Sequence, residues 1–429
     1  MFYKAPITTP LGGGYKSLNV TIRKSLGLFA NVRPCVSYHP HVPSAHPNMD
    51  MVIVRENEED LYAGIEHRQT DEVYQCLKLI TQPGSERVIR YAFEYAEANG
   101  RKKVTCFSKN NIMKLTDGVF EQTFQEVAKE YPHIKSDHMI VDIGTAKVAV
   151  DPGAFDVLVL PNLYGDIISD VAAEITGSVG LAGSANIGEF GAMFEAIHGS
   201  APMIAGLGVA NPSGLILGGV QMLTHVGQPA VAELVHNAWL STIEQGKTTA
   251  DIHTSSARTT GAPLKTDQFA DAVIANLGTK PTEMTPVDYT SNNNSKPLHI
   301  PPFKRRAPAK KEMVGVDVFL HCAKRSPDEL AAALNEATAK CGSGLRLNML
   351  TNRGVKVWPG GIPETFCTDH WRARFLPEGN TGSEYPHTAS HADMLKLLAT
   401  VNDFGLDFIK IETLCTFDGK AGFSLGQGQ

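Results

Sequence analysis

The stretch NLYGDIISDVAAEI, residues 162–175, carries three acidic residues at intervals of four, Asp166, Asp170 and Glu174. It follows the apolar run FDVLVLP, so a buried strand is expected to lead into a helix that holds the carboxylates on one face, about 5–6 Å apart. Their mutual repulsion needs a cation or solvent to offset it. The spacing alone leaves two interpretations open, a solvated helix face or a divalent cation site.

Three arginines within the first sixty residues form a second group of chemical interest. Arg23 lies in KSLNVTIR, Arg33 in NVRP and Arg55 in VIVREN. A guanidinium is always charged and binds a carboxylate through two parallel hydrogen bonds. Three that converge would suit a polycarboxylate substrate, although for any one of them alone surface charge is the better interpretation.

A tyrosine and a lysine could supply proton transfer. Tyr62 lies in RENEEDLYAGIEH, and Lys109 and Asn111 follow a predicted strand in FSKNNIMKLTDG. Such groups near a metal can act as general acid and base if their surroundings bring their pKa values toward the operating pH. For Lys109, simple solvation is the alternative.

The composition is that of a globular protein of two or three domains. The 429 residues are 42% hydrophobic and 20% charged, and no Lys/Arg block is interleaved with aromatic residues, so no nucleic-acid partner is expected. The seven cysteines include no C-x-x-C pair, which indicates reduced thiols. Neither a span of the ~20 apolar residues that cross a bilayer nor a signal segment is recognisable. We therefore expect no membrane association and a cytoplasmic location, or the mitochondrial matrix if a eukaryotic leader is missing.

The pattern along the chain predicts an α/β protein with a separate C-terminal module. Short β-branched runs alternate with amphipathic helices over residues 51–278, which is typical of a sheet covered by helices. Residues 281–312 are rich in Pro, Asn, Ser and Thr and read as a linker. Residues 313–429 give the order β-α-β-β-α-β, which predicts a small ferredoxin-like α+β domain for packing, dimer contact or regulation.

Several motifs together resemble the isocitrate/isopropylmalate dehydrogenase family, and most closely its isocitrate dehydrogenases. They include TTPLGGGYKSLNVTIRK, VIVRENEEDLYAGIEH, NLYGDIISD and FEAIHGSAPMIAGLGVANPSG, in unbroken order over about residues 7–277. The linker and C-terminal module resemble the extra domain of the Thermus-type members. The resemblance implies a catalytic region over residues 1–280, with large-domain segments at about 1–30 and 175–280 and a small domain at about 31–174.

The resemblance implies metal-dependent oxidative decarboxylation of isocitrate to 2-oxoglutarate and CO2, a reaction of the tricarboxylic acid cycle, with reduction of NAD or NADP. It assigns the substrate carboxylates to Ser17, Asn19, Arg23, Arg33 and Arg55. Ser17 and Asn19 would hold the distal carboxylate, where isopropylmalate relatives carry an apolar residue for an alkyl group.

The resemblance also offers an interpretation of the opening acids. Asp166 and Asp170, with the partner subunit's Asp142, would bind Mg²⁺ or Mn²⁺. Lys109 from the partner subunit would take the hydroxyl proton, and Tyr62 would return a proton to the enolate. A homodimer with shared active sites is implied.

For the cofactor, the sequence favours NAD over NADP. NADP-dependent relatives carry Lys-Tyr at the Met203-Ile204 position and often Tyr and Arg at Ala250 and Thr254, and none of these side chains here offers a charge to a 2′-phosphate. The resemblance implies a cofactor site formed by Thr9, Asn111, Glu195, His198, Gly199, Ala201, Met203, Ile204, Asn211 and Asp251.

The family begins with a β-α unit upstream of the TTP stretch at which this chain nearly starts. We therefore expect an N-terminally truncated large domain with an unpaired sheet edge and exposed apolar surface. Two alternatives to an active isocitrate dehydrogenase stay open. One is a non-catalytic or regulatory paralogue that binds isocitrate and metal; the other is an isopropylmalate or homoisocitrate dehydrogenase.

Overall fold

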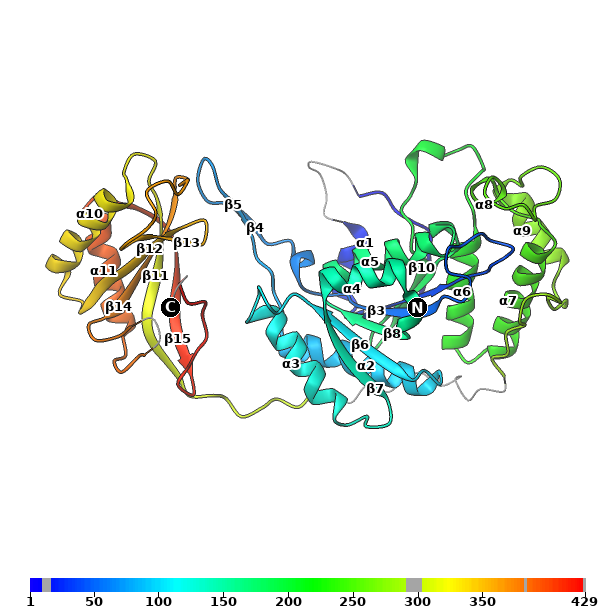
Figure 1. The fold of residues 1–429 in the computed structure, drawn as a ribbon, viewed down its shortest axis with the longest axis horizontal. Helices are drawn as coiled ribbons and strands as arrows, with labels where there is room; N and C mark the ends of the chain where they lie inside the picture. Colours follow the sequence, from blue (N-terminus) through cyan, green and yellow to red (C-terminus); the bar gives the residue numbers. More distant parts are fainter. Residues whose placement is uncertain (10–16, 291–302, 382–383, 427–429) are drawn as a thin grey trace. The chain divides into compact units, whose positions relative to one another are not determined.

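The computed structural model describes residues 1–9, 17–290, 303–381 and 384–426 (Figure 1). The chain divides into two compact units. The first comprises Met1–Ala63 and Lys78–Phe303, and the second comprises Gly64–Leu77 and Lys304–Gln429. Residues 291–302 of the predicted linker lie outside the described residues.

The first unit is built on an eight-stranded mixed sheet in the order β1-β10-β9-β2-β3-β8-β6-β7. From β3 to β7 neighbouring strands run parallel and are joined through helices, as parallel connections require. The pairs β2/β3, β2/β9 and β9/β10 are antiparallel. The strands are β1 (Phe2–Lys4), β2 (Ala30–Val36), β3 (Asp50–Glu56), β6 (Lys103–Ser108), β7 (Lys135–Ile140), β8 (Val157–Leu160), β9 (Gly183–Ile187) and β10 (Ala192–Ala196).

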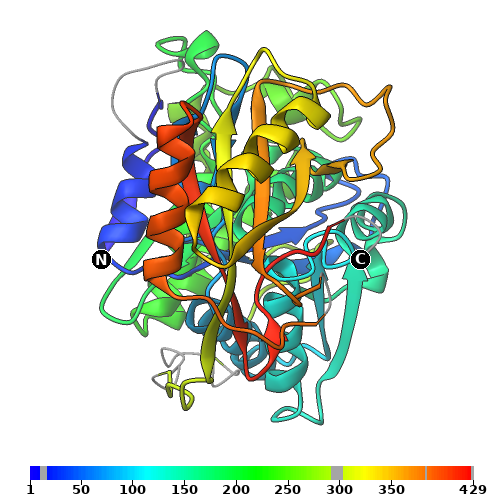
Figure 2. The same ribbon diagram turned by 90° about the vertical axis from the view of Figure 1, so that its left-hand side faces the viewer.

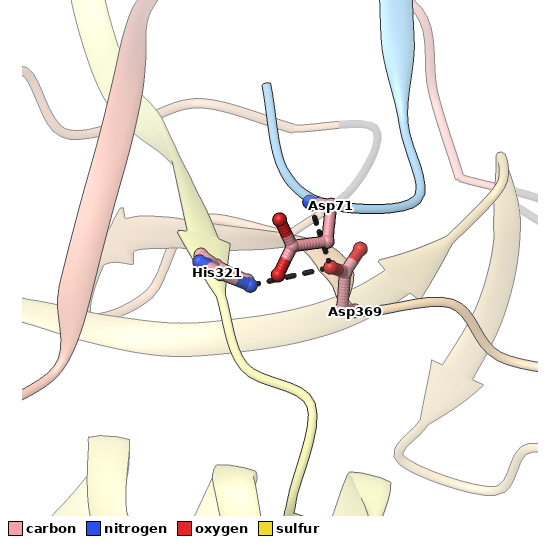
Figure 3. Close-up of side chains that lie close together, drawn as sticks. All are labelled: Asp71, His321 and Asp369. Atoms are coloured by element: carbon pink, nitrogen blue, oxygen red, sulfur yellow. Dashed lines mark hydrogen bonds and ion pairs between the residues drawn. The ribbon is translucent and has the colours of Figure 1, made fainter. Parts of the chain in front are cut away.

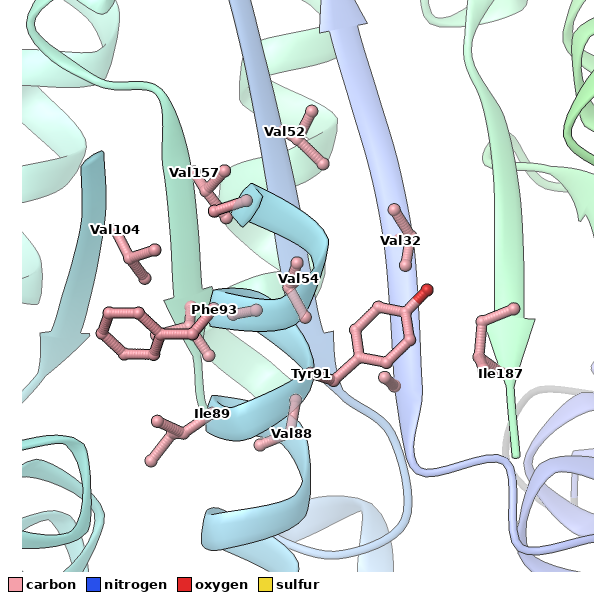
Figure 4. Packing of buried hydrophobic residues seen from close by; sticks show 14 of the residues in the cluster. Val32, Val52, Val54, Val88, Ile89, Tyr91, Phe93, Val104, Val157 and Ile187 are labelled. Carbon is pink, nitrogen blue, oxygen red and sulfur yellow. The ribbon is translucent and has the colours of Figure 1, made fainter. Parts of the chain in front are cut away.

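Helices cover both faces of the central strands. On one face α2 (Gln82–Ala98) and α3 (Thr116–Ala128) form the main core with apolar side chains such as Val52 and Val54 (Figure 4). On the other face α5 (Asn162–Ile175) packs on Ile53. Because successive side chains of a strand alternate between faces, Arg33 and Arg55 point toward the α5 side.

The remaining helices of the first unit form a third cluster around the buried Trp239. They are α6 (Ser213–His225), α7 (Pro229–Glu244), α8 (Ala250–His253) and α9 (Thr266–Ala275), while α1 (Leu18–Ser25) and α4 (Val141–Val150) flank the sheet. Single 3-10 turns are η1 (Leu61–Ala63), η2 (Pro152–Ala154), η3 (Val179–Leu181) and η4 (Pro202–Ile204). No helix in the described ranges is long and apolar enough to cross a membrane.

The second unit confirms the predicted α+β domain. Its antiparallel sheet has the order β13-β12-β14-β11-β15-β16, in which the inner four strands have the ferredoxin-like arrangement. Both helices lie on one face of this sheet (Figures 1 and 2). The elements are β11 (Lys311–His321), α10 (Pro327–Cys341), β12 (Leu345–Asn352), β13 (Val355–Trp358), β14 (His370–Pro377), α11 (His391–Asp403), β15 (Asp407–Phe417) and β16 (Lys420–Ala421). The segments VKVW and FCTDHWRARFL were alternatives for the third predicted strand, and both contribute strands, β13 and β14, while β16 is an addition to the predicted order.

One hairpin groups with the second unit, although the sequence placed it within the small domain at 31–174. It consists of β4 (Glu66–Arg68) and β5 (Tyr74–Cys76). Asp369 N donates to Glu72 Oε2 at 2.9 Å, and Lys410 Nζ lies 3.5 Å from Gln75 Oε1. Polar contacts between residues far apart in the sequence hold the hairpin, and no local pattern could have indicated them.

Candidate active site

Two buried arginines on adjacent strands form the base of the candidate site. Arg33 on β2 is 3% exposed and Arg55 on β3 is 1% exposed. Helix α5 reaches them because Gly165 has no side chain: a Cβ there would lie 2.6 Å from Arg55 Cγ. Asn162, at the start of α5, accepts from Arg55 Nη2 at 2.7 Å and from Nε at 3.0 Å. The helix is thereby held against the two guanidiniums.

Asp166 lies at the centre of this group. Its Oδ1 accepts from Arg55 Nη1, and its Oδ2 accepts from the Tyr62 hydroxyl. Arg33 Nη2 is 3.3 Å from Asp166 Oδ1, while Arg33 Nη1 is 3.5 Å from Asp170 Oδ1. The structure therefore brings together five residues that the sequence assigned to substrate, metal and proton transfer.

The pKa values of the two carboxylates, Asp166 and Asp170, are shifted in opposite directions. Burial opposes the ionisation of Asp166, but the guanidiniums of Arg55 and Arg33 outweigh it and lower the pKa of Asp166. Partial desolvation, together with the neighbouring Asp166 carboxylate, raises the pKa of Asp170 in spite of Arg33. Burial, together with the neighbouring Arg33, lowers the pKa of Arg55 to about 10, which leaves that guanidinium charged at neutral pH. The cluster is thus a cationic pocket whose own aspartate is ionised.

The third arginine of the sequence prediction has a different partner. Arg23 Nη2 donates to Glu195 Oε1 at 3.1 Å, and Lys4 Nζ lies 2.6 Å from Glu195 Oε2. Glu195, which the resemblance assigned to the cofactor, here anchors Arg23. Ser17 is the N-cap of α1 and accepts from Val20 N, while the buried Asn19 Oδ1 has no hydrogen-bond partner among the described residues. As an acceptor, this oxygen cannot pair with a substrate carboxylate, whereas the amide Nδ2 of Asn19 can donate to one.

Lys109 and Asp142 form a pair of their own. Lys109 Nζ lies 2.9 Å from Asp142 Oδ1. Within the described ranges, one group of three His, Cys, Asp or Glu residues has its ligand atoms within 4.8 Å of one another, and it contains none of Asp142, Asp166 and Asp170. A single chain therefore does not assemble the predicted three-aspartate set.

The residues assigned to the cofactor lie mainly in two places. His198 Nδ1 contacts Gly199 O at 2.9 Å. Ala201 has a left-handed backbone (φ 45°) that turns the chain into η4. On η4, Met203 is 91% exposed and Ile204 is partly exposed. Asn211 Nδ2 donates to Asp251 Oδ2 at 2.9 Å, which ties α8 to the segment before α6. Thr9 and Asn111 are exposed.

Glu56 is a buried carboxyl that the sequence analysis missed. It is 2% exposed and accepts from Glu58 N at 2.7 Å, which turns the chain after β3. Burial raises the pKa of Glu56 from 4.5 to about 7. Nothing in the acidic string RENEED distinguishes it from its neighbours, because its burial depends on α5 packing over β3.

This carboxyl predicts a pH-dependent stability. Below pH 4.5 Glu56 is protonated in both the folded and the unfolded chain. Between pH 4.5 and 7 only the unfolded chain ionises, so the free energy of unfolding falls as pH rises. Above pH 7 Glu56 is ionised in both states, and the free energy of unfolding no longer changes. Glu56→Gln keeps the acceptor oxygen but cannot ionise. The variant should therefore lack this fall in the free energy of unfolding, which is about 3 kcal/mol by pH 8. Denaturant titrations at pH 5 and pH 8 measure it, with the exposed Glu66→Gln as control. Equal pH dependence in Glu56→Gln and wild type would contradict the assignment.

The one group with close ligand atoms in the described part of the chain, Asp71, His321 and Asp369, lies in the second unit (Figure 3). Asp369 Oδ1 accepts from Thr70 Oγ1 at 2.5 Å, and Asp369 Oδ2 accepts from Asp71 N at 3.2 Å and lies 3.2 Å from His321 Nε2. The carboxylate oxygens are thus already used to hold the β4–β5 hairpin. The cluster has a structural role in this arrangement.

A cavity of about 1670 Å³ lies away from the arginine cluster. Val32, Val52 and Tyr91 line it, and these side chains belong to the α2 side of the sheet. Arg33 and Arg55 point to the opposite face of the sheet. The cavity is therefore not the site that the charged residues form. We assign the site from the convergent charges.

Comparison with known proteins agrees with this geometry. A model of the isocitrate/isopropylmalate dehydrogenase family matches residues 1–273, and one of the C-terminal domain of bacterial isocitrate dehydrogenase matches residues 311–429. A Rickettsia bellii protein named isocitrate dehydrogenase, NADP, is 50% identical over 426 residues, 99% of this chain and 86% of the relative. A Thermus thermophilus protein of the same name is 42% identical, covering 99% and 83%. The crystal structure of the TT0538 protein from Thermus thermophilus matches with a TM-score of 0.89 at 41% identity, covering 100% and 83%.

These relatives overturn one expectation, the preference for NAD. Both are named for NADP. The sequence argument relied on uncharged side chains at four positions, yet a cation from another segment can serve a 2′-phosphate equally well. Lys265, at the start of α9, is a candidate for this cation: Thr266 N donates to Gly208 O at 2.9 Å, which places this end of α9 beside the loop that follows η4.

Proposed function

Since the chain belongs to the isocitrate/isopropylmalate dehydrogenase family, we propose that it catalyses the oxidative decarboxylation of isocitrate to 2-oxoglutarate and CO2 with NADP. The observation that carries this proposal is the convergence of Arg33, Arg55, Tyr62, Asp166 and Asp170. Two guanidiniums that are almost fully buried need anionic partners, and substrate carboxylates are suitable ones.

The substrate preference follows from α1. Arg23 Nε on this helix is buried and has no hydrogen-bond partner among the described residues, and as a donor it suits a carboxylate oxygen. Ser17, the N-cap residue of α1, carries a hydroxyl that can also donate. A buried polar group favours a ligand that can hydrogen-bond with it and disfavours an alkyl group, because the alkyl group would leave it unpaired. This supports isocitrate over isopropylmalate.

The donor set fits a hard divalent cation. Asp166 and Asp170 are carboxylates on one helix face, and the Asp170 side chain is 62% exposed, so its oxygens are accessible. We assign Asp166 and Asp170 of one subunit and the partner's Asp142 to Mg²⁺ or Mn²⁺. The bound cation supplies Lewis-acid polarisation of the substrate oxygens.

The side chains of the protein hold the substrate and move protons. Arg33 and Arg55 orient the carboxylates. The partner's Lys109 accepts the hydroxyl proton, and Tyr62, whose pKa is raised by burial despite Arg55, donates a proton to the carbon that has lost CO2. Because Lys109 and Asp142 pair with each other away from Asp166, we propose a homodimer that completes each site from two chains.

A spectrophotometric assay at 340 nm tests the proposed function. Purified protein with isocitrate and Mn²⁺ is expected to reduce NADP with a higher kcat/KM than NAD, and isopropylmalate is expected to give no signal. Lys265→Met should raise KM for NADP while leaving KM for NAD unchanged, with the exposed Lys102→Met as control. Absence of isocitrate-dependent reduction of either nucleotide would refute the proposal.

A further inference from the structure

An ammonium group lies between two fully buried carboxylates near the candidate active site. Lys78 Nζ is 3.1 Å from Asp60 Oδ1 and 3.1 Å from Asp117 Oδ1, and neither aspartate side chain is exposed to solvent. Nζ also lies 4.6 Å from the centroid of the Tyr164 ring on α5. Two buried carboxylates side by side are strongly unfavourable unless a cation is shared between them, so Lys78 is what permits this arrangement.

Each aspartate uses its other oxygen to hold a segment that carries a proposed catalytic or metal-binding residue. Asp117 Oδ2 accepts from the backbone N of Lys109 at 2.6 Å. Asp60 Oδ2 accepts from Leu163 N at 2.9 Å in the first turn of α5, where the N-cap residue Pro161 offers no side-chain acceptor. Asp60 therefore caps the helix that carries the central aspartate of the site.

The same lysine is linked to a third segment through Asp60. That residue has a left-handed backbone (φ 65°), and its carbonyl accepts from Ala63 N at 3.2 Å, which closes the turn that holds Tyr62. One ammonium thus ties together the Lys109 loop, which in the proposed homodimer serves the partner's site, and the start of α5 and the Tyr62 turn, which serve the site of the same chain.

We propose that Lys78 is a positioning residue for the reaction. Its ammonium pairs with the two aspartates, and through Asp117 and Asp60 it fixes the Lys109 loop and the start of α5. This inference rests on the proposed function, since it assumes that Lys109 and Tyr62 transfer protons. Without the ammonium the two carboxylates repel each other, and the segments they hold separate. A displacement of about 1 Å in a catalytic constellation lowers the rate by about a hundredfold.

Lys78→Met tests the proposal, with Lys103→Met as a matched control. Lys103 also pairs with an aspartate, Asp137 at 3.4 Å, and lies near an aromatic ring, but at the opposite end of β6 from Lys109. We expect Lys78→Met to lower kcat at least about tenfold with a smaller change in KM for isocitrate. Lys103→Met should keep kcat within about twofold of wild type.

A second variant separates positioning from folding. Lys78→Met combined with Asp117→Asn has the same net buried charge as wild type and keeps an acceptor oxygen for Lys109 N. A low kcat in Lys78→Met, with a circular dichroism spectrum like that of wild type, and recovery of kcat in the double variant support the proposal, because the double variant has no second carboxylate to repel Asp60. Wild-type kcat in a folded Lys78→Met overturns the proposal. Unfolding of both variants at the assay temperature also overturns it, since the lysine would then serve the fold as a whole. Inactive wild-type enzyme would instead refute the proposed function.

Discussion

Asp166→Asn is expected to lower isocitrate turnover by at least about a thousandfold, because several kcal/mol of charge stabilisation is lost with one metal-binding carboxylate. Asp166 is also the group toward which Arg33, Arg55 and Tyr62 converge. Its loss leaves two buried guanidiniums without their shared anion. Steady-state rates at saturating isocitrate and Mn²⁺, with Mn²⁺ affinity from electron paramagnetic resonance, measure the two consequences.

Asp170→Asn separates metal binding from stability. The Asp170 side chain is 62% exposed and its contact with Arg33 is long, 3.5 Å, so its removal should leave the unfolding temperature nearly unchanged. Both variants should bind Mn²⁺ at least about tenfold more weakly, and Asp166→Asn alone should also unfold at a lower temperature. Metal-dependent turnover at the wild-type level in Asp166→Asn would exclude Asp166 as a metal ligand.

The resemblance to the family, rather than the spacing of charges, assigned most of this cluster to one site. Periodicity places Asp166 and Asp170 on one helix face, and Arg55 ends a predicted strand, but the spacing alone left a solvated face and a cation site both open. Asn162, which accepts from Arg55, and Ser169, which accepts from Arg33 Nη1 at 2.5 Å, were not predicted. Small polar residues of this kind acquire a role only when two elements pack, and one sequence does not show that packing.

Contacts between distant segments account for the rest of what was missed. Lys78, Asp60 and Asp117 look like ordinary surface charges in the sequence, yet both aspartates are fully buried. The β4–β5 hairpin reads as part of the small domain, yet Asp369 holds it to the C-terminal sheet. The expectation of NAD is contradicted by relatives named for NADP. An argument from the absence of charge at four positions could not exclude a cation on another element.

Tyr62→Phe is expected to lower kcat by about a hundredfold or more, the usual contribution of a positioned proton donor, with little change in KM for isocitrate. The phenyl ring can still stack under Arg55, whose Cζ lies 4.8 Å from the ring centroid, so the pocket keeps its packing. The hydroxyl is the only group removed.

The matched control is Tyr131→Phe, which also loses a phenol-to-carboxylate hydrogen bond, to Glu94 Oε1 at 2.5 Å, but in the α2–α3 core. The decisive measurement is exchange of the C3 hydrogen of 2-oxoglutarate with D2O, followed by NMR with Mn²⁺ and NADPH present, because that exchange is the reverse of the proton donation assigned to Tyr62. Wild type and Tyr131→Phe should exchange, while Tyr62→Phe should not. Exchange at the wild-type rate in Tyr62→Phe would move the proton donor to another residue, since a general acid must act in both directions of the same step.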